Sequence, residues 1–228
     1  MKMRGIFVLL LLAMMQNVAN AQEHELTVSD VRDSGCLGQT RGAEDATPTV
    51  TIDGLKYYLS PDTHEAFVYN GNIWTGELII PSEVSYNDET YSVNGLLWKA
   101  FANSTELTKV MIPKTIVQIV NHAFSDNPEF GSSVSPDYKN PFLGCTSLEC
   151  IEVDKGNPSM CSVDGVLFSK DSTQLYSYPV GDKATSYKVP DGVTWIGMNT
   201  FEGSPYLKSV EMPNSVRQLC PGAFYKCI

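Results

Sequence analysis

Apolar residues recur at fixed steps along the second half of the chain. The interval from Phe101 to Phe124 is the same as the interval from Phe201 to Phe224. Steps of three, five, six and three between apolar positions fit neither the stripe of a long helix nor the alternation of a simple strand. One repeat runs Pro190, Val193, Ile196, Phe201, Leu207, Val210, Met212. We therefore expect 23-residue circuits, each a coil of short segments with its apolar side chains inside.

Each circuit is predicted to contain one short strand and one tight turn. Leu207, Val210 and Met212 lie at the spacing of a strand, and Pro190-Asp191-Gly192 is a favourable turn tripeptide. Strands of successive circuits would stack as a ladder about 4.8 Å apart. A single circuit buries too few apolar side chains to offset the entropy of ordering its backbone. Stability must therefore come from neighbouring circuits and end caps.

Interruptions of the period leave its phase intact. The interval from Pro81 to Pro113 exceeds one period by nine positions, and Tyr86 to Tyr91 within it predicts a protruding hairpin tip. Segments that preserve the phase belong in loops outside the stacked core. The expected insertions are about 85–93, 125–141 and 154–186, within a solenoid that spans 78–228.

The repeat pattern resembles a known family. Its consensus, Ile-Pro-x-x-Val-x-x-Ile-x-x-x-Ala-Phe-x-x-Cys-x-x-Leu-x-x-Ile, is carried by 111–124, 142–148 and 212–227. This is similar to the BspA-like leucine-rich repeats of exported bacterial proteins, and Asn157 to Leu167 is similar to that family's interrupting hairpin. The resemblance implies a mostly β, right-handed leucine-rich-repeat solenoid with hairpin insertions. It also implies a secreted or surface protein with a binding role, because no catalytic motif defines the family.

Residues 49–77 precede the period and are predicted to form an amino-terminal β cap. Val50 to Tyr57 and Glu65 to Tyr69 have the composition of strands, and 70–72 that of a turn. Such a cap would shield the apolar end of the first circuit. At the other end the chain stops at Ile228, four residues after Phe224. This predicts either a premature end or an exposed ladder edge that pairs edge to edge with another chain.

The first residues of the chain predict that the protein is exported. Lys2 and Arg4, an apolar run and Ala19-Asn20-Ala21 form a secretory signal peptide over 1–21. Its apolar run is shorter than a spanning helix requires, so no transmembrane segment is expected after cleavage. Residues 22–48 are polar and aperiodic, which predicts a tether. The product would be exported, to the periplasm, the cell surface or the medium.

Charge and composition exclude several functions. The 228 residues include 16 Lys+Arg and 26 Asp+Glu, a net charge of −10 that disfavours nucleic-acid binding. The histidines His24, His64 and His122 are scattered, and no CxxC, phosphate-binding loop or nucleophile motif occurs. We expect no metal, no cofactor and no enzymatic activity, unless an insertion conceals a site.

The cysteines fit the repeat better than they fit catalysis. Cys145 and Cys227 each follow their Phe by three, with Ser204 at the same position in the circuit between them. Two ladder steps, about 10 Å, exceed the reach of a disulfide. We interpret both as small buried residues of a ladder, whereas a bridge among Cys150, Cys161 and Cys220 stays open.

Two functions remain. The first is a recognition module whose outward strand positions bind a protein, possible contacts being Lys109, Met111, Glu149, Glu152, Lys208 and Glu211. The alternative is glycan binding by exposed Tyr and Trp, for which Trp195 is a candidate because it stands between inward Val193 and Ile196. Aromatic packing inside the cap and hairpins is the competing use of these rings, and we favour it.

Overall fold

A computed structural model describes residues 49–69, 71–120 and 140–227. The chain divides into two compact units, Met1–Asp45 and Ala46–Ile228, and all described residues belong to the second. The expected signal peptide over 1–21, the tether over 22–48, Phe124 and most of the expected insertion 125–141 lie outside the described residues.

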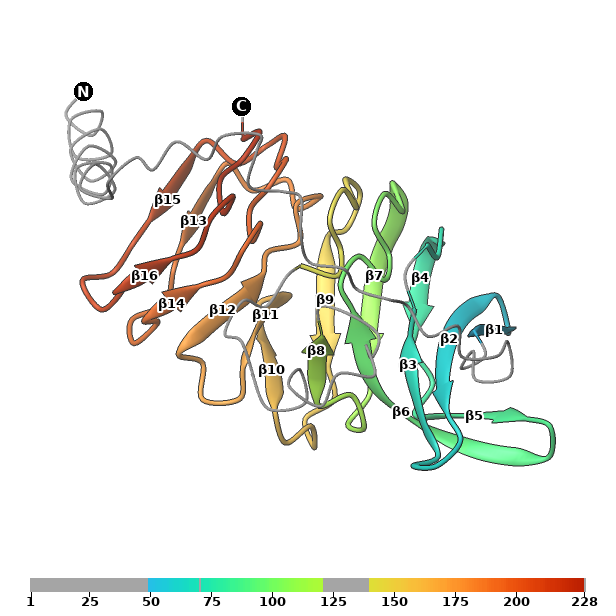
Figure 1. Ribbon diagram of the computed structural model, residues 1–228. Helices are drawn as coiled ribbons and strands as arrows, with labels where there is room; N and C mark the ends of the chain where they lie inside the picture. Colours follow the sequence, from blue (N-terminus) through green and yellow to red (C-terminus); the bar gives the residue numbers. More distant parts are fainter. Residues whose placement is uncertain (1–48, 70, 121–139, 228) are drawn as a thin grey trace, which may run out of the picture. The chain divides into compact units, whose positions relative to one another are not determined.

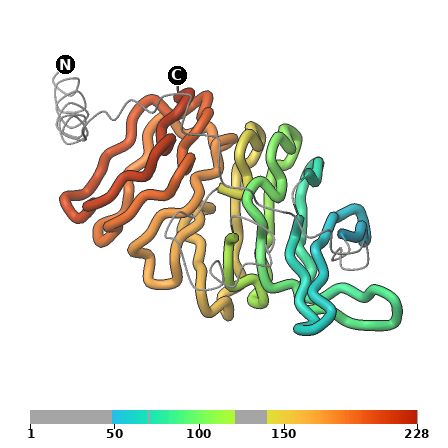
Figure 2. Tube along the Cα trace, in the orientation of Figure 1, coloured from blue at the N-terminus to red at the C-terminus, as the bar shows by residue number. Residues whose placement is uncertain are grey.

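Within the described residues the fold is built of strands and turns without helix (Figure 1). The colours of the chain follow one another from the β1 end to the β16 end, so successive segments are stacked in order (Figure 2). The strands are β1 Thr49–Ile52, β2 Leu55–Ser60, β3 Glu65–Val68, β4 Thr75–Ile79, β5 Glu83–Tyr86, β6 Glu89–Leu97, β7 Glu106–Ile112, β8 Gln118–Val120, β9 Cys150–Val153, β10 Met160–Val163, β11 Val166–Ser169, β12 Gln174–Ser177, β13 Ser186–Lys188, β14 Trp195–Ile196, β15 Ser209–Glu211 and β16 Gln218–Leu219.

Parallel pairs connect strands of successive segments. They run β4-β7-β9 and β13-β15 in two sheets, and β3-β6-β8 and β12-β14-β16 within the two others. In three of these pairs the hydrogen-bonded partners lie one predicted period apart: Gly95 with Gln118, Ser186 with Ser209 and Trp195 with Gln218. The chain thus returns to the same lateral position after each such interval.

Two parallel pairs span longer intervals without losing alignment. Leu78 pairs with Val110, and Val110 in turn pairs with Ile151. The first interval exceeds one period by nine positions and the second by eighteen. The strands still align their buried side chains, so the extra length lies outside the ladder.

Antiparallel hairpins surround these ladders. The stretch from Val50 to Tyr57, expected as one strand, is divided into β1 and β2 by a turn at Asp53-Gly54, whose φ angles are 49° and 83°. Both angles are left-handed, as a two-residue hairpin turn of Asp-Gly type requires. The expectation of a single strand was wrong because this turn signal was overlooked.

The hairpin of β5 and β6 lies where the sequence places its nine extra residues. Its turn is Asn87-Asp88, again with left-handed φ angles of 51° and 63°. The hairpin projects from the stacked strands (Figure 1). Val84 and Tyr91 anchor its base because both are buried.

Aromatic rings form rungs in the interior. Phe101 stacks on Phe142, with ring centroids 5.7 Å apart, and Phe201 stacks on Phe224 at 4.9 Å. On the other side of Phe201 lies Tyr178, at 5.2 Å. Tyr178 and β12 lie within the segment 154–186 expected outside the ladder, yet β12 pairs with β14 and Tyr178 takes a rung. The end of that segment therefore belongs to the stack.

Three fully or almost fully buried asparagines join segments that are distant in sequence. Asn157 makes four hydrogen bonds: its Nδ2 donates to the carbonyls of Pro113 and Ile116, and its Oδ1 accepts from the N–H groups of Ser159 and Met160. Asn72 joins Lys56 and Tyr69 to Ala100, and Asn140 joins Phe142, Ser177 and Asn199. Each amide satisfies backbone groups that a turn leaves unpaired, which is required in a buried loop.

The position three residues after each Phe is polar and small. Cys145 Sγ lies 3.0 Å from the Phe101 carbonyl, and Cys227 Sγ lies 3.1 Å from the Phe201 carbonyl. Both thiols thus reach back to the preceding rung. Cys145 is buried, as the ladder interpretation expects, whereas Cys227 is only half-buried, so the expectation of burial was wrong for it. Cys150 and Cys161 are free thiols, so none of the bridges left open among Cys150, Cys161 and Cys220 forms.

Candidate recognition surface

We define the ladder face as the outward side chains of the two parallel sheets β4-β7-β9 and β13-β15. Along these strands, inward residues such as Leu78, Val110 and Ile151 are buried, and their neighbours point outward. The sequence therefore fixes which side chains each strand presents. Backbone hydrogen bonds hold those side chains at regular intervals.

Strand register arranges the outward side chains of the first sheet in two rows. Ile79, Met111 and Glu152 form one row. Glu77, Lys109 and Cys150 form the other. The first row carries two exposed apolar side chains beside a carboxylate, and the second carries a carboxylate beside an ammonium group.

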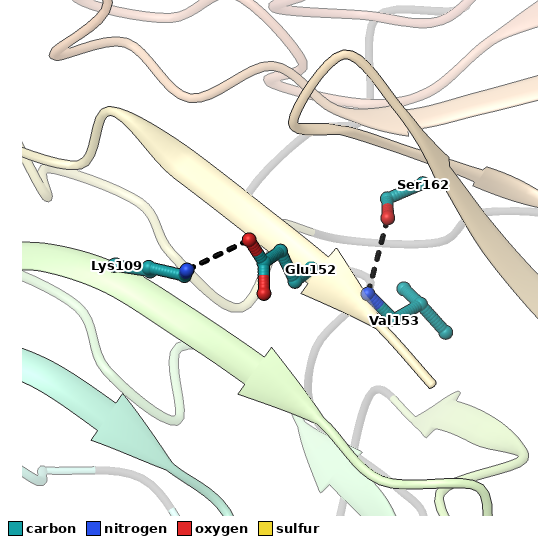
Figure 3. Close-up of polar contacts among 4 residues, drawn as sticks. All are labelled: Lys109, Glu152, Val153 and Ser162. Carbon is teal, nitrogen blue, oxygen red and sulfur yellow. Dashed lines mark hydrogen bonds and ion pairs between the residues drawn. The ribbon is translucent and has the colours of Figure 1, made fainter. Parts of the chain in front are cut away.

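An ion pair links the two rows diagonally. Lys109 Nζ lies 2.7 Å from Glu152 Oε1 (Figure 3). The hydrogen bond to Glu152 raises the pKa of Lys109, so this ammonium stays charged throughout the physiological range. Two of the predicted contact residues therefore neutralise each other in the free protein.

Further ion pairs occupy the remaining predicted positions. Glu149 pairs with Lys183 at 3.0 Å, and Glu211 pairs with Lys188 of the neighbouring strand β13 at 3.3 Å. Lys208 is exposed beside β15. Met111 is 38% exposed in β7. All six predicted residues thus lie on or next to the ladder face, in two groups carried by its two sheets.

A hairpin separates these two groups. The Ile151 N–H donates to the carbonyl of Gly165 at 2.9 Å, and the Val153 N–H donates to Ser162 Oγ at 3.1 Å (Figure 3). Ser162 and Gly165 belong to the hairpin of β10 and β11. This hairpin therefore satisfies the edge of β9, and β13 begins a new sheet beyond it.

Sequence reasoning missed Ile79. Its side chain is 70% exposed at the end of β4, where it extends the apolar row that Met111 begins. Leu78-Ile79-Ile80 is a continuous apolar run, and alternation along a strand places its central residue on the opposite side from its neighbours. That alternation was the available signal.

Trp195, the candidate for an outward ring, is buried, so the sequence-based alternative of an exposed Trp195 is wrong and the favoured use in packing holds for this ring. Its side chain is only 6% exposed and meets Tyr176 edge-on, with ring centroids 6.1 Å apart. Tyr176 comes from β12, which the period alone did not place beside β14. Exposed aromatic rings lie elsewhere, at Tyr206 and at Tyr225, which is 57% exposed with Lys226 Nζ 5.1 Å from its ring.

The described residues offer little for catalysis. Burial raises the pKa of the Cys145 thiol to about 12, which keeps it protonated and unreactive. His64 stacks on Tyr91 with ring centroids 5.7 Å apart, and His24 and His122 lie outside the described residues. In the described ranges no three His, Cys, Asp or Glu residues gather as a metal site would need. Within the same residues, no helix has the length and hydropathy to cross a bilayer.

Short parallel strands stacked around aromatic rungs define a leucine-rich-repeat protein. The family model described as BspA type Leucine rich repeat region matches six copies, over residues 96–180 and 175–228. This is more than half of the chain, so the protein belongs to that family.

Several solved structures are similar to this chain at low identity. A leucine-rich repeat protein from Bacteroides ovatus is 20% identical with a TM-score of 0.45; the match covers 78% of this chain and 45% of that one. The T. pallidum leucine-rich repeat protein is 21% identical with a TM-score of 0.41, covering 78% and 67%. A leucine-rich cell surface protein from Faecalibacterium prausnitzii is 18% identical with a TM-score of 0.33, covering 80% and 75%. Among curated proteins none matches this chain.

Proposed function

We propose that the protein is an exported recognition module, secreted or held at a cell surface, that binds a protein partner through the ladder face without catalysis. The observation that carries the proposal is the two aligned rows on β4, β7 and β9, where exposed apolar and charged side chains alternate on a hydrogen-bonded sheet. A preorganised surface of this kind loses little conformational entropy on binding.

The ion pairs on this face are compatible with partner exchange. Lys109–Glu152, Lys183–Glu149 and Lys188–Glu211 all have partly exposed side chains. Exposed pairs contribute about 0–1 kcal/mol each, so breaking one to engage a partner costs little. The six contact residues proposed are Lys109, Met111, Glu149, Glu152, Lys208 and Glu211.

The proposal includes a finer architecture. It comprises a right-handed solenoid of 23-residue circuits over 78–228, a cap over 49–77, a signal peptide over 1–21 and a tether over 22–48. The strand registers that repeat at this interval support the circuits. The cap is supported by Phe67 of β3, whose ring fills the space beside Gly95 so closely that a Cβ there would lie 2.7 Å from it.

Site-specific photo-crosslinking tests the ladder face. A photoreactive residue at Met111 should capture a protein of a different chain, whereas the same residue at Val117 should not. The two positions are matched, because their side chains are 38% and 39% exposed. Lys109→Glu should then weaken binding of the purified captured protein. Equal capture from both positions would remove the support for this face.

Glycan binding remains the second candidate, now without Trp195. Tyr225 and Tyr206 supply exposed rings of the kind that stack on sugars. Binding on a glycan array that Tyr225→Ala abolishes and Lys109→Glu leaves unchanged would favour this function over protein recognition.

A further inference from the structure

Strand β4 is the edge of its sheet. It pairs with β7 on one side, and within the described residues no strand pairs with its other side. Four of its five residues are exposed, and only Leu78 is buried. Ile73, just before the strand, and Ile79 at its end are the two most exposed large apolar residues of the described chain. A long edge with exposed apolar side chains is a template for strand addition unless it is protected.

The backbone of β4 presents usable hydrogen-bonding groups at this edge. The Ile80 N–H donates to the Met111 carbonyl at 3.1 Å, so in the trans peptide that precedes it the Ile79 carbonyl points away from β7. The Ile79 N–H points the same way as the Ile79 carbonyl, because residues alternate in the side to which they bond. Ile79 therefore offers one donor and one acceptor at the open edge.

Trp74 covers the part of the β4 edge near Glu77. Its indole Nε1 donates to the Glu77 carbonyl at 3.3 Å, so that acceptor is already engaged. The ring also lies close to Gly54, where an added Cβ would come within 3.3 Å of it. Any added strand must therefore either stop beside Ile79 or displace a weak, exposed hydrogen bond.

The charges near the β4 edge determine which side chains an added strand should carry. Glu77 is exposed on β4, and Glu106 is exposed on β7 opposite Thr75. The nearby Lys109 is already paired with Glu152. Glu77 is in register with Lys109, which also binds Glu152, so its carboxylate is only partly neutralised. Because Glu77 and Ile79 lie two residues apart on one face of β4, a fitting strand carries a basic and an apolar residue two positions apart on that face.

We propose that the open edge of β4 captures, by strand addition, an extended segment of another protein that carries basic and apolar residues two positions apart on one face. Ile79 supplies the main-chain hydrogen bonds, Ile73 and Ile79 contact the apolar side chains, and Glu77 pairs with a basic side chain. Glu77 and Ile79 belong to the ladder face, but neither is among its six proposed contact residues. Variants of Glu77 and Ile79 therefore test the β4 edge, and variants of the six contact residues test the proposed function.

Two other occupants fit less well. A second copy paired antiparallel on β4 would bring Glu77 close to its own counterpart, and like charges across a strand pair are destabilising. The chain's own residues 22–48 carry six acidic residues against two arginines, so they share the sign of the edge. Both occupants can be recognised in the experiment below.

The probe is a short, soluble peptide added to the full chain, in which every second residue is alternately valine and lysine and the residues between them are threonine. Its counterpart carries glutamate in place of lysine. We expect the lysine peptide to bind and to slow hydrogen exchange at the Ile79 amide, measured by NMR, with little effect at β5. The glutamate peptide should bind at least about tenfold more weakly, because it places like charges opposite Glu77.

Matched variants separate strand addition from general attraction to an acidic protein. Glu77→Lys should weaken the lysine peptide roughly tenfold, and Glu83→Lys, the same charge change on β5, less than about twofold. Ile79→Pro removes an edge N–H that β7 does not use, and it should abolish binding with the fold retained by circular dichroism. Trp74→Phe frees the Glu77 carbonyl and should strengthen binding about threefold.

Several results would overturn the proposal. These are equal binding of both peptides, equal loss in Glu77→Lys and Glu83→Lys, unchanged binding in Ile79→Pro, or protection that maps away from β4. Sedimentation of a dimer that Ile79→Pro dissociates would assign the edge to a second copy. Protection of the Ile79 amide before any peptide is added, lost when residues 22–48 are deleted, would assign it to the chain itself.

Discussion

The same repeat positions differ in burial between the middle and the end of the described stack. In β7, Val110 and Ile112 are fully buried. Their counterparts in β15 and directly after it, Val210 and Met212, are only half-buried. β7 has a strand on each side, whereas β15 has β13 on one side and, in the described chain, none on the other.

The difference shows that neighbours, not the residues themselves, complete the core. The two segments have similar side chains at the same spacing, so their intrinsic hydrophobicity cannot explain it. Each circuit leaves one apolar flank open until the next strand covers it, which is the nearest-neighbour behaviour of stacked repeats. The middle and end of the stack should therefore respond differently to the same mutation.

The largest expected contrast is between Phe101→Ala and Phe224→Ala. Phe101 is completely buried and Phe224 is half-buried, so we expect losses of about 4 and about 2 kcal/mol in the free energy of unfolding. Urea unfolding of both variants measures this. Equal losses would mean that the end rung is as well supported as the middle one.

Asn157→Leu should cost about 3 kcal/mol, because it removes four hydrogen bonds from a fully buried side chain and leaves backbone groups unpaired. Asn157→Asp keeps the two accepted hydrogen bonds but replaces the Nδ2 donor by an oxygen. It separates the two halves of the amide's role. Chemical unfolding of both variants measures the losses. If Asn157→Leu is as stable as the wild type, packing rather than hydrogen bonding holds that turn.

Alkaline pH should destabilise the stack through its buried phenols. Burial raises the pKa of Tyr57 from 10.0 to about 12, and burial also raises the pKa of Tyr178 and Tyr187 in the second half. Above pH 10 the unfolded chain loses phenol protons that the folded chain retains, so stability falls as the pH rises from 10 towards 12.

Two variants divide this loss of stability between the buried phenols: the single variant Tyr57→Phe and the double variant that combines Tyr178→Phe with Tyr187→Phe. The double variant should flatten the stability profile more than the single variant, because it removes two buried phenols instead of one. Unfolding curves measured on either side of pH 10 test this. Identical profiles in all variants would attribute alkaline unfolding to other groups.

Among the residues that lie three positions after a repeat Phe, Ser204 is expected to stabilise the fold least. Its Oγ is buried and has no hydrogen-bond partner in the described residues, whereas Cys145 and Cys227 reach a carbonyl. Ser204→Cys should raise stability by about 1 kcal/mol, because the longer thiol can reach the preceding rung. Cys145→Ser should lower it by a similar amount. Thermal unfolding under reducing conditions checks both.

The smallest effect is expected at Lys226. It occupies a left-handed position two residues after Phe224, with φ of 55°, where Gly144 and Gly203 stand in other circuits. Lys226→Gly should add about 0.5–1 kcal/mol by removing the Cβ strain, measured by urea unfolding. Lys226→Ala, which also removes the charge but keeps the Cβ, should give no gain.

Much of this architecture could be predicted because residues one repeat period apart occupy equivalent positions in neighbouring circuits. The spacing of Phe201 and Phe224 predicts that they stack, and the excess of nine residues after Pro81 falls in the β5–β6 hairpin. Such features depend only on which residues are apolar and how far apart they lie. No knowledge of neighbouring segments was needed.

What could not be predicted depends on segments that the period does not align. Trp195 is buried because Tyr176 covers it, and Tyr176 comes from a segment outside the recognised repeat. The open edge of β4 beside Ile79 follows from the absence of a further strand there in the described chain, which a local pattern does not reveal. The six contact residues were placed by outward alternation alone, so the ion pairs among them were not foreseen.

The hairpin against β9 has a consequence for how such chains can change. Ser162 and Gly165 accept hydrogen bonds from backbone N–H groups of β9. The sheet that follows can therefore start without pairing to β9. Gly181 then brings the returning backbone so close to Ser147 that a Cβ would lie 2.3 Å from its carbonyl carbon. A hairpin that ends one sheet in this way allows a segment to be inserted between two repeats, provided that the glycine at this close approach is kept. Such a site allows the repeat array to gain segments in evolution, and it is a practical position for grafting foreign loops.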